Sequence, residues 1–179
     1  MPESYVLRAF TAADLPMMAQ WLAAPHLRQW WGDPAEEMAL LSEDLDNPLM
    51  DQHIGMLANR GRADGGWADG AVAYLQSYPC HAWGAPQFKD RPDGSRSVDM
   101  CIGPAEMLGF GHGHAILRLY AETLQMRGAT DIVIDPDPSN ERAVRCYRRA
   151  GFRDVAICEG EDGDPVLVME FNPAPTFSS

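Results

Sequence analysis

A glycine-rich segment in the second half of the chain limits its possible folds more than any other feature of the sequence. Leu108-Gly-Phe-Gly-His-Gly113 follows an apolar stretch, 98–103, that predicts a strand. It precedes 115–127, whose apolar spacing predicts a helix that ends at Gly128. Glycines at such a junction let backbone N–H groups approach an anion at the positive end of a helix. A pyrophosphate is the natural candidate for such an anion, while the default interpretation of the glycines alone is an ordinary strand–helix turn.

The surroundings of this segment argue against two common phosphate-binding folds. No Gly-Lys-Ser or Gly-Lys-Thr follows the glycines, as a Walker loop requires. A dinucleotide-binding fold is disfavoured because the sequence lacks its acidic residue at a strand end and its βαβ repeat.

Short strands and amphipathic helices are predicted along the rest of the chain. Strands are expected over 4–10, 53–58, 70–78, 98–103, 132–135, 152–158 and 165–171, and helices over 11–24, 34–45, 115–127 and 139–150. The segment 79–97, with three prolines and two glycines, is expected to be the one long loop. This order predicts an α/β (α+β) fold, with one domain over 1–172 and a disordered tail over 173–179.

The charge of the chain limits its partners. Its 179 residues include 14 Lys and Arg and 26 Asp and Glu, a formal net charge of −12. Such a chain repels nucleic-acid phosphates, so we expect no nucleic-acid partner. An acidic cleft would instead attract cations, with solubility alone as the alternative reason for the charge.

Membrane and metal partners are not expected either. No apolar run approaches the ~20 residues of a membrane span, and the N-terminus does not resemble a secretory signal, which predicts a cytoplasmic protein. The four cysteines have neither a CxxC pair nor zinc-ligand spacing, so we expect reduced packing residues and no bound metal.

Three segments after the glycine loop resemble the GCN5-related N-acetyltransferase (GNAT) superfamily. They are Ile134-Asp-Pro-Asp-Pro-Ser-Asn140, Ala143-Val-Arg-Cys-Tyr147 and Ala150-Gly-Phe152. The resemblance implies a GNAT-type mixed, mostly antiparallel central sheet of about seven strands flanked by helices, and acetyl-CoA as co-substrate. Leu108 departs from the family pattern, because many members carry Arg or Gln there, so only backbone groups are expected to bind phosphate at that position.

The resemblance also implies which residues contact the coenzyme. Its pyrophosphate would bind at the glycine loop, and its pantetheine and thioester beside the preceding strand and a later helix. The residues so implied are Cys101, Ile102, Gly109, Gly111, His112, Gly113, His114, Asn140 and Tyr147. Packing within the loop is the alternative for the two histidines. Asn140 can also cap the following helix.

Within the superfamily, three further segments resemble aminoglycoside 6′-N-acetyltransferases. They are His26-Leu-Arg-Gln-Trp-Trp-Gly32, Tyr74-Leu-Gln-Ser-Tyr78 and Val98-Asp-Met-Cys-Ile-Gly103. The resemblance implies a substrate cleft lined by Trp30, Trp31, Gln76, Tyr78, Asp99 and Asp135. Paired tryptophans are usually core residues, so we expect only one of the two to face the substrate.

Catalytic roles are predicted for Asp99, Asp135 and Tyr147. Each aspartate occupies a strand position otherwise filled by apolar residues, so it must be paired or face water. A carboxylate there can bind an ammonium group and accept its proton, and the alternative is capping of a turn. Family members place a hydroxyl near the coenzyme sulfur at the position of Tyr147, which implies a general acid for the leaving thiolate.

The expected activity is therefore acetyl-CoA-dependent N-acetylation of a primary amine on a polycationic small molecule, with the 6′-amine of an aminoglycoside as the favoured acceptor. The resemblance implies direct attack in a ternary complex. The enzyme alternative is a hydroxylamine acetyltransferase of siderophore assembly, which Ile102-Gly-Pro104 resembles although its relatives usually have His at the position of Asp99. A non-catalytic acyl-CoA-binding module and a protein-amine acetyltransferase remain open. A monomer or homodimer is expected.

Overall fold

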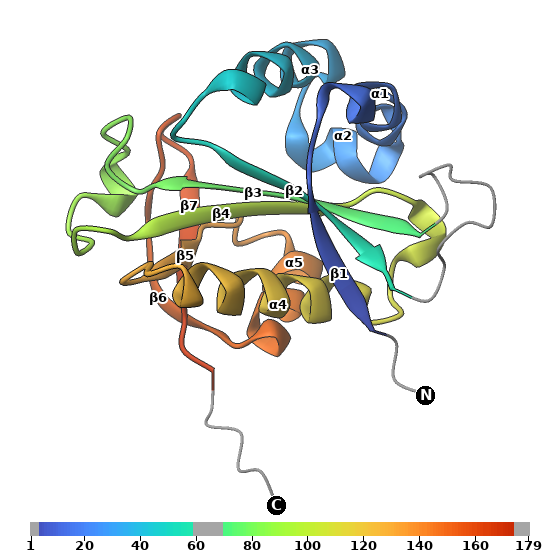
Figure 1. The fold of residues 1–179 in the computed structure, drawn as a ribbon. Coiled ribbons are helices and arrows are strands. Elements are labelled where there is room, and N and C mark those ends of the chain that lie inside the picture. The colour runs from blue at the N-terminus through green and yellow to red at the C-terminus, as the bar shows by residue number, and fades with distance from the viewer. Residues whose placement is uncertain (1–3, 59–69, 174–179) are drawn as a thin grey trace, which may run out of the picture. The chain divides into compact units, whose positions relative to one another are not determined.

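The computed structural model describes residues 4–58 and 70–173, whose strands form a seven-stranded sheet in the order β1-β2-β3-β4-β5-β7-β6 (Figure 1). The strands are β1 (Tyr5–Ala9), β2 (Asp51–Leu57), β3 (Ala71–Pro79), β4 (Arg96–Ile102), β5 (Ile132–Ile134), β6 (Phe152–Glu159) and β7 (Pro165–Phe171). β1 is antiparallel to β2, and β7 is antiparallel to both β5 and β6, whereas β4 and β5 are parallel. The expected α/β fold with a mostly antiparallel sheet is confirmed.

The helices follow the predicted pattern with one addition. They are α1 (Leu15–Ala23), α2 (Pro25–Trp31), α3 (Pro34–Glu43), α4 (His112–Met126) and α5 (Glu141–Ala150), with short 3-10 turns η1 (Ala12–Asp14), η2 (Asp44–Asp46), η3 (Pro86–Phe88) and η4 (Ala105–Met107). The added helix is α2. Pro25 ends the helical pattern of α1 as expected, but it also starts α2, because its fixed φ and missing N–H suit the first position of a helix.

Other boundaries differ in detail. α4 begins at His112 rather than at residue 115, so the last glycine of the loop belongs to its first turn. The segment 79–97 is not one continuous loop, because it contains η3 and the first residues of β4. The residues that connect β2 and β3 lie mostly outside the described residues, as does the predicted tail except for residue 173.

The described chain divides into two compact units. The first contains residues 4–58, 70–76 and 100–116, and the second contains 77–99 and 117–173. β3 and β4 run through both units. A single acetyltransferase domain over 1–172 stays a prediction.

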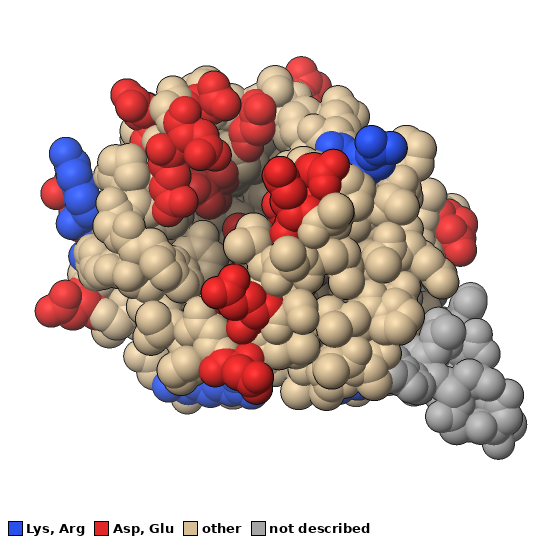
Figure 2. All heavy atoms as spheres, turned by 90° about the horizontal axis from the view of Figure 1, so that it is seen from above, with Lys and Arg blue, Asp and Glu red and all other residues tan. Residues whose placement is uncertain are grey.

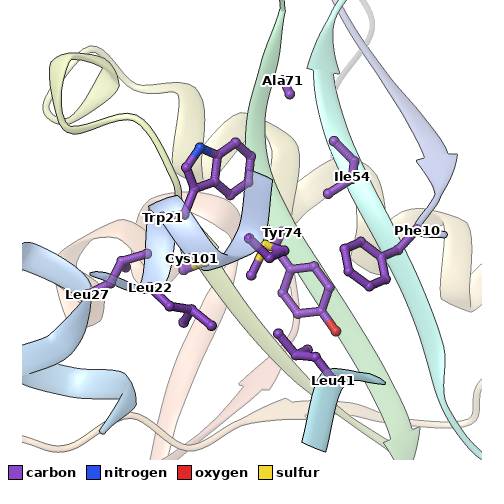
Figure 3. Packing of buried hydrophobic residues seen from close by; sticks show 10 residues of the cluster. Phe10, Trp21, Leu22, Leu27, Leu41, Ile54, Ala71, Tyr74 and Cys101 are labelled. Atoms are coloured by element: carbon purple, nitrogen blue, oxygen red, sulfur yellow. The ribbon is translucent and has the colours of Figure 1, made fainter. Parts of the chain in front are cut away.

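The core of the first unit lies between its helices and the strands β2, β3 and β4 (Figure 3). Its buried residues are Phe10, Met18, Trp21, Leu22, Leu27, Leu41, Ile54, Ala71, Tyr74 and Cys101. The Phe10 and Tyr74 rings meet edge to face at 5.2 Å between centroids. A Cβ on Gly103 would overlap the Trp21 indole, so only glycine lets α1 pack this closely on the end of β4.

A buried ion pair fixes the start of the helical region in the first unit. The Arg8 guanidinium donates to both oxygens of Asp14, at 2.8 and 2.6 Å, and the Asp14 side chain is fully buried. Asp14 Oδ2 also accepts from the Thr11 backbone N–H at 2.8 Å, as in a capping box at the start of a helix. The charge of Asp14 is therefore paired rather than isolated.

Within residues 4–58 and 70–173, none of the helices has the length and apolar character needed to span a bilayer.

Candidate active site

The parallel pairing of β4 and β5 gives two aspartates equivalent positions in the second unit. The pairing covers only Arg96 opposite Ile132 and Ser97 opposite Val133. Asp99 and Asp135 each lie two residues beyond the second pair, and residues two apart on a strand point to the same face. Asp99 lies in β4 and Asp135 directly follows β5, so both carboxyl groups lie where the pairing of these neighbouring strands ends.

The surroundings of Asp135 shift the pKa of its carboxyl group. Burial, and then the negative charges of Asp99 and Glu161, raise its pKa from 3.8 to about 7. Gln87 acts in the opposite direction, because its Nε2 donates a hydrogen bond to Asp135 Oδ2 at 3.0 Å. Asp135 thus changes its charge near neutral pH, as a group that both takes up and releases protons must.

Tyr78 lies beside the same carboxyl groups. The charge of Asp99, followed by burial and the charges of Asp135 and Glu161, raises its pKa far above the ordinary range, so the phenol stays protonated. Trp83 meets the Tyr78 ring edge to face at 5.0 Å and is 53% exposed. Acidic groups and aromatic surface together suit a ligand that carries both ammonium groups and apolar ring faces.

Two residues of this cluster were missed by sequence reasoning. Glu161 lies in the polar turn between β6 and β7, where acidic residues are ordinary and give no signal. Gln87 lies in η3, inside the segment 79–97, whose irregular pattern predicted only a loop. Both contribute through contacts made by distant segments, which no local pattern records.

The second unit also contains Tyr147 and Asn140. Tyr147 is only 9% exposed and shares the buried face of α5 with Val144 and Ala150. Asn140 caps α5, because its Oδ1 accepts from the Ala143 N–H at 3.1 Å. The capping role of Asn140 is confirmed, while its contact with the coenzyme stays a prediction.

The glycine loop belongs to the first unit and has the backbone that the sequence predicts. Gly109 and Gly111 have φ of +85° and +93°, which residues with a side chain rarely adopt. Nothing lies within 4 Å of the position that a Cβ on Gly109 would take. The first turn of α4 follows directly, so its backbone N–H groups lie at the same place as the loop.

The two histidines of the loop differ in environment. His112 is buried, and its Nδ1 lies 2.9 Å from the Tyr5 hydroxyl, so packing is a demonstrated role for this side chain. His114 is half-buried and its ring lies against Gly111. Phe110, between the glycines, is 77% exposed.

Trp31 and Gln76 are both in contact with Tyr74 in the first unit. The Trp31 ring meets the Tyr74 ring edge to face at 6.1 Å. Gln76 Oε1 accepts from the Tyr74 hydroxyl, which in turn accepts from Gln52 Nε2, both at 2.8 Å. Trp30 is half-buried on α2. Trp31 is thus the tryptophan that packs on the core, and Trp30 is the better candidate for a substrate contact.

The end of β4 is held by backbone contacts. His26 Nε2 lies 2.9 Å from the Ile102 carbonyl oxygen, and the Gly103 N–H donates to the Val72 carbonyl oxygen at 2.9 Å.

Burial raises the pKa of the Cys101 thiol to about 12, so this cysteine is not a thiolate at neutral pH. All four cysteines are free thiols, as expected.

Across the part of the chain described, no three His, Cys, Asp or Glu side chains are placed to hold a metal ion together.

The chain belongs to the GNAT acetyltransferase family, because residues 11–159 match a family model described as an acetyltransferase (GNAT) domain. It is 30% identical to the aminoglycoside N(6′)-acetyltransferase type 1 of Klebsiella pneumoniae over 181 aligned positions, which cover 96% of this chain and 85% of the relative.

Solved structures of aminoglycoside acetyltransferases have a similar fold. A structure of AAC(6′)-Ib in complex with ribostamycin and coenzyme A gives a TM-score of 0.80 at 31% identity, covering 95% of this chain and 94% of that one. A structure of AAC(6′)-Ib in complex with coenzyme A and kanamycin gives a TM-score of 0.76 at 31% identity, covering 93% and 94%.

Proposed function

We propose that this chain transfers the acetyl group of acetyl-CoA to the 6′-amine of an aminoglycoside. The observation that carries the proposal is the carboxylate pair formed by Asp99 in β4 and Asp135 directly after β5, because the charge of Asp99 acts on Asp135. Glu161 adds a third negative charge, and Tyr78 and Trp83 add aromatic surface. The relatives named above support the same acceptor and the same coenzyme.

The carboxylates act on the amine. An aminoglycoside amine is mostly an ammonium ion at neutral pH, and it must lose a proton before it can attack a carbonyl carbon. Asp99 and Asp135 bind the cationic acceptor, and Asp135 takes the proton because its pKa of about 7 is close to neutral pH. Two carboxyl groups in different environments thereby take different roles.

The glycine loop holds the coenzyme, with the pyrophosphate on the backbone N–H groups of 109–114. The positive φ of Gly109 and the open space beside it support this, since a side chain there would keep a phosphate from the backbone. The backbone of Cys101 and Ile102 contributes to the same site. In the second unit, the side chain of Asn140 is a further proposed coenzyme contact. When bound, acetyl-CoA supplies an activated acetyl thioester.

Tyr147 donates the proton that the leaving thiolate needs. In the first unit, Trp30 and Gln76 are the proposed acceptor contacts, whereas Trp31 packs on Tyr74 in the core. In the second unit, Tyr78 is the proposed acceptor contact. A covalent acetyl-cysteine route is disfavoured at Cys101, because its raised pKa leaves no thiolate to attack the thioester. The proposal therefore is direct transfer from coenzyme to amine.

A thiol-release assay tests the proposal with a matched pair of acceptors. Acetyl-CoA is mixed with an aminoglycoside that bears a 6′-amine, and separately with one that bears a 6′-hydroxyl in its place. We expect thiol release and a product heavier by one acetyl group with the first and not with the second.

Other outcomes identify the alternatives. Release only with hydroxylamines would replace the proposal by siderophore-type acetylation. Coenzyme binding in calorimetry without release from any amine would indicate a non-catalytic acyl-CoA-binding module.

Cellular location and assembly form part of the same proposal. Acetyl-CoA as co-substrate supports action in the cytoplasm. The family match over 11–159 supports one acetyltransferase domain over 1–172. We propose that this domain acts as a monomer or homodimer.

A further inference from the structure

The segment 79–97 is seated firmly within the second unit. Phe88, in η3, is fully buried, and Cys80 and Ala85 are buried with it. They pack against Val133 of β5 and Val168 of β7. η3 is therefore fixed against the strand whose end carries Asp135.

Polar contacts hold the second half of the same segment. Arg91 Nη1 donates to Asp131 Oδ2 at 3.1 Å and to Glu170 Oε2 at 2.9 Å. The Thr130 hydroxyl donates to the Asp93 carbonyl oxygen at 2.7 Å. With apolar packing before it and these contacts after it, η3 has little freedom to move away from β5.

This seating brings the Gln87 amide to Asp135, 48 residues further along the chain. Gln87 Nε2 donates to Asp135 Oδ2 at 3.0 Å. The other end of the amide, Oε1, is buried and has no hydrogen-bond partner among the described residues. A buried acceptor without a partner is unfavourable, and here it is next to a carboxylate that we assign to substrate binding.

We propose that Gln87 is a positioning residue for the acceptor amine: its N–H orients the Asp135 carboxylate, and its Oε1 accepts a hydrogen bond from the same aminoglycoside. The inference rests on the proposed function for the identity of the acceptor. It adds a residue from the segment 79–97 to the acceptor site.

The charges around Asp135 determine how loss of the Gln87 side chain changes the pKa of Asp135. Asp99 on β4 and Glu161 in the β6–β7 turn act on it with negative charge. The protonated groups of Tyr78 on β3 and of Cys80, directly after β3, interact with it as well. These carboxylates favour protonation of Asp135, whereas the Gln87 hydrogen bond favours the ionised form. Removing the bond should move ionisation of Asp135 to higher pH.

The experiment measures kcat and KM of the full chain from pH 6 to pH 9 for wild type, Gln87→Leu, Gln87→Glu and a matched control, Gln125→Leu. Gln125 is exposed on α4 and lies in the same unit. For Gln87→Leu we expect the acid limb of kcat/KM to move up by about one pH unit, with a loss of about fivefold at pH 7 that shrinks toward pH 9.

The other variants separate the parts of the proposal. Gln87→Glu keeps the acceptor oxygen but brings a like charge to Asp135, so its acid limb should move at least as far. KM for the aminoglycoside should rise at every pH in Gln87→Leu, because the Oε1 acceptor is lost. Gln125→Leu should match wild type throughout.

A carbon-13 NMR titration of the Asp135 carboxyl in the free protein, assigned with Asp135→Asn, separates this inference from the proposed function. If Asp135 titrates in Gln87→Leu as in wild type, or if the loss of activity is the same at every pH, the positioning role is overturned. If Asp135 titrates at higher pH in Gln87→Leu but wild type acetylates no aminoglycoside, the contact stands and the proposed acceptor fails. That result also overturns the part of this inference that concerns Oε1.

Discussion

The ionisation of Asp135 affects the stability of the folded chain. Its pKa is about 7 in the folded chain against 3.8 for an exposed aspartate, so the folded state binds more protons between these values. The free energy of unfolding therefore decreases as pH rises from 4 to 7. We predict that Asp135→Asn gains stability relative to wild type over this range, by about 2–4 kcal/mol.

Urea unfolding of both proteins at pH 4, 5.5, 7 and 8 measures this effect. Asp162→Asn, a change at an exposed position in the β6–β7 turn, is the control and should show a difference nearly independent of pH. A constant difference for Asp135→Asn as well would mean that the carboxyl ionises like an exposed one.

Tyr147 allows a second test on a single atom. Tyr147→Phe removes only the hydroxyl and keeps the ring that packs on the buried face of α5. We predict that kcat falls about hundredfold, at the lower end of the range for loss of a general acid, while KM changes little. Steady-state kinetics measures both constants. An unchanged kcat, with chemistry shown to be rate-limiting by rapid quench, would remove the proton-donor role.

At the scale of single elements, the glycine loop and α4 are the part most completely predicted from the sequence. Strand, glycines and helical spacing are local signals, and the observed positive φ values agree with them. α2 was not predicted as a helix, because Pro25 and the two tryptophans were interpreted as a break and a cleft segment. Helices as short as α2 depend on tertiary packing, here that of Leu27 in the core.

We predict that a β-branched residue in this loop weakens coenzyme binding beyond its effect on stability. Gly111→Val and Gly128→Val both force a valine into positive φ, at +93° and +96°, so both should lose about 1–2 kcal/mol of stability. Gly128 lies after the far end of α4 and touches nothing at its Cβ position, which makes it the matched control.

Calorimetry with acetyl-CoA distinguishes the two positions. Affinity should fall at least tenfold in Gly111→Val and stay within about twofold in Gly128→Val, if backbone N–H groups of the loop hold the pyrophosphate. Equal affinities in two folded variants would place the phosphates elsewhere.

At the scale of the whole molecule, the net charge of −12 favours a cationic partner. On the face shown in Figure 2, most of the coloured side chains are acidic. The proposed acceptor carries several positive charges, so its binding should depend on ionic strength. Salt screens exposed charges strongly and buried pairs less.

We predict that aminoglycoside affinity falls with added salt, and falls less steeply in Asp99→Asn and Asp135→Asn than in wild type. Each lost ammonium–carboxylate contact should weaken binding by about 1.5–3 kcal/mol at low salt, roughly ten- to hundredfold. Calorimetry from 20 to 500 mM salt measures this, with acetyl-CoA affinity of the variants as the control. If both variants bind aminoglycosides like wild type at every salt concentration, a neutral acceptor replaces the polycation.

The sequence by itself determined the order of the strands and of every helix except α2, together with the glycine loop, the Asn140 cap and the residues of the GNAT resemblance. These follow from local chemistry: alternation of apolar residues, capping side chains, and glycines where φ must be positive. Asp99 and Asp135 could also be identified as candidate site residues. A charged side chain among the apolar residues of a predicted strand must be paired or face water.

Only the tertiary structure decided what surrounds those aspartates. The parallel register that gives Asp99 and Asp135 equivalent positions joins strands from separate parts of the chain. The raised pKa of Asp135 arises from Asp99, Glu161 and burial, and its hydrogen bond comes from Gln87 in a segment without a periodic pattern. Electrostatic and hydrogen-bond energies depend on distance in space, and distance in space between remote residues is set by packing rather than by any local sequence pattern.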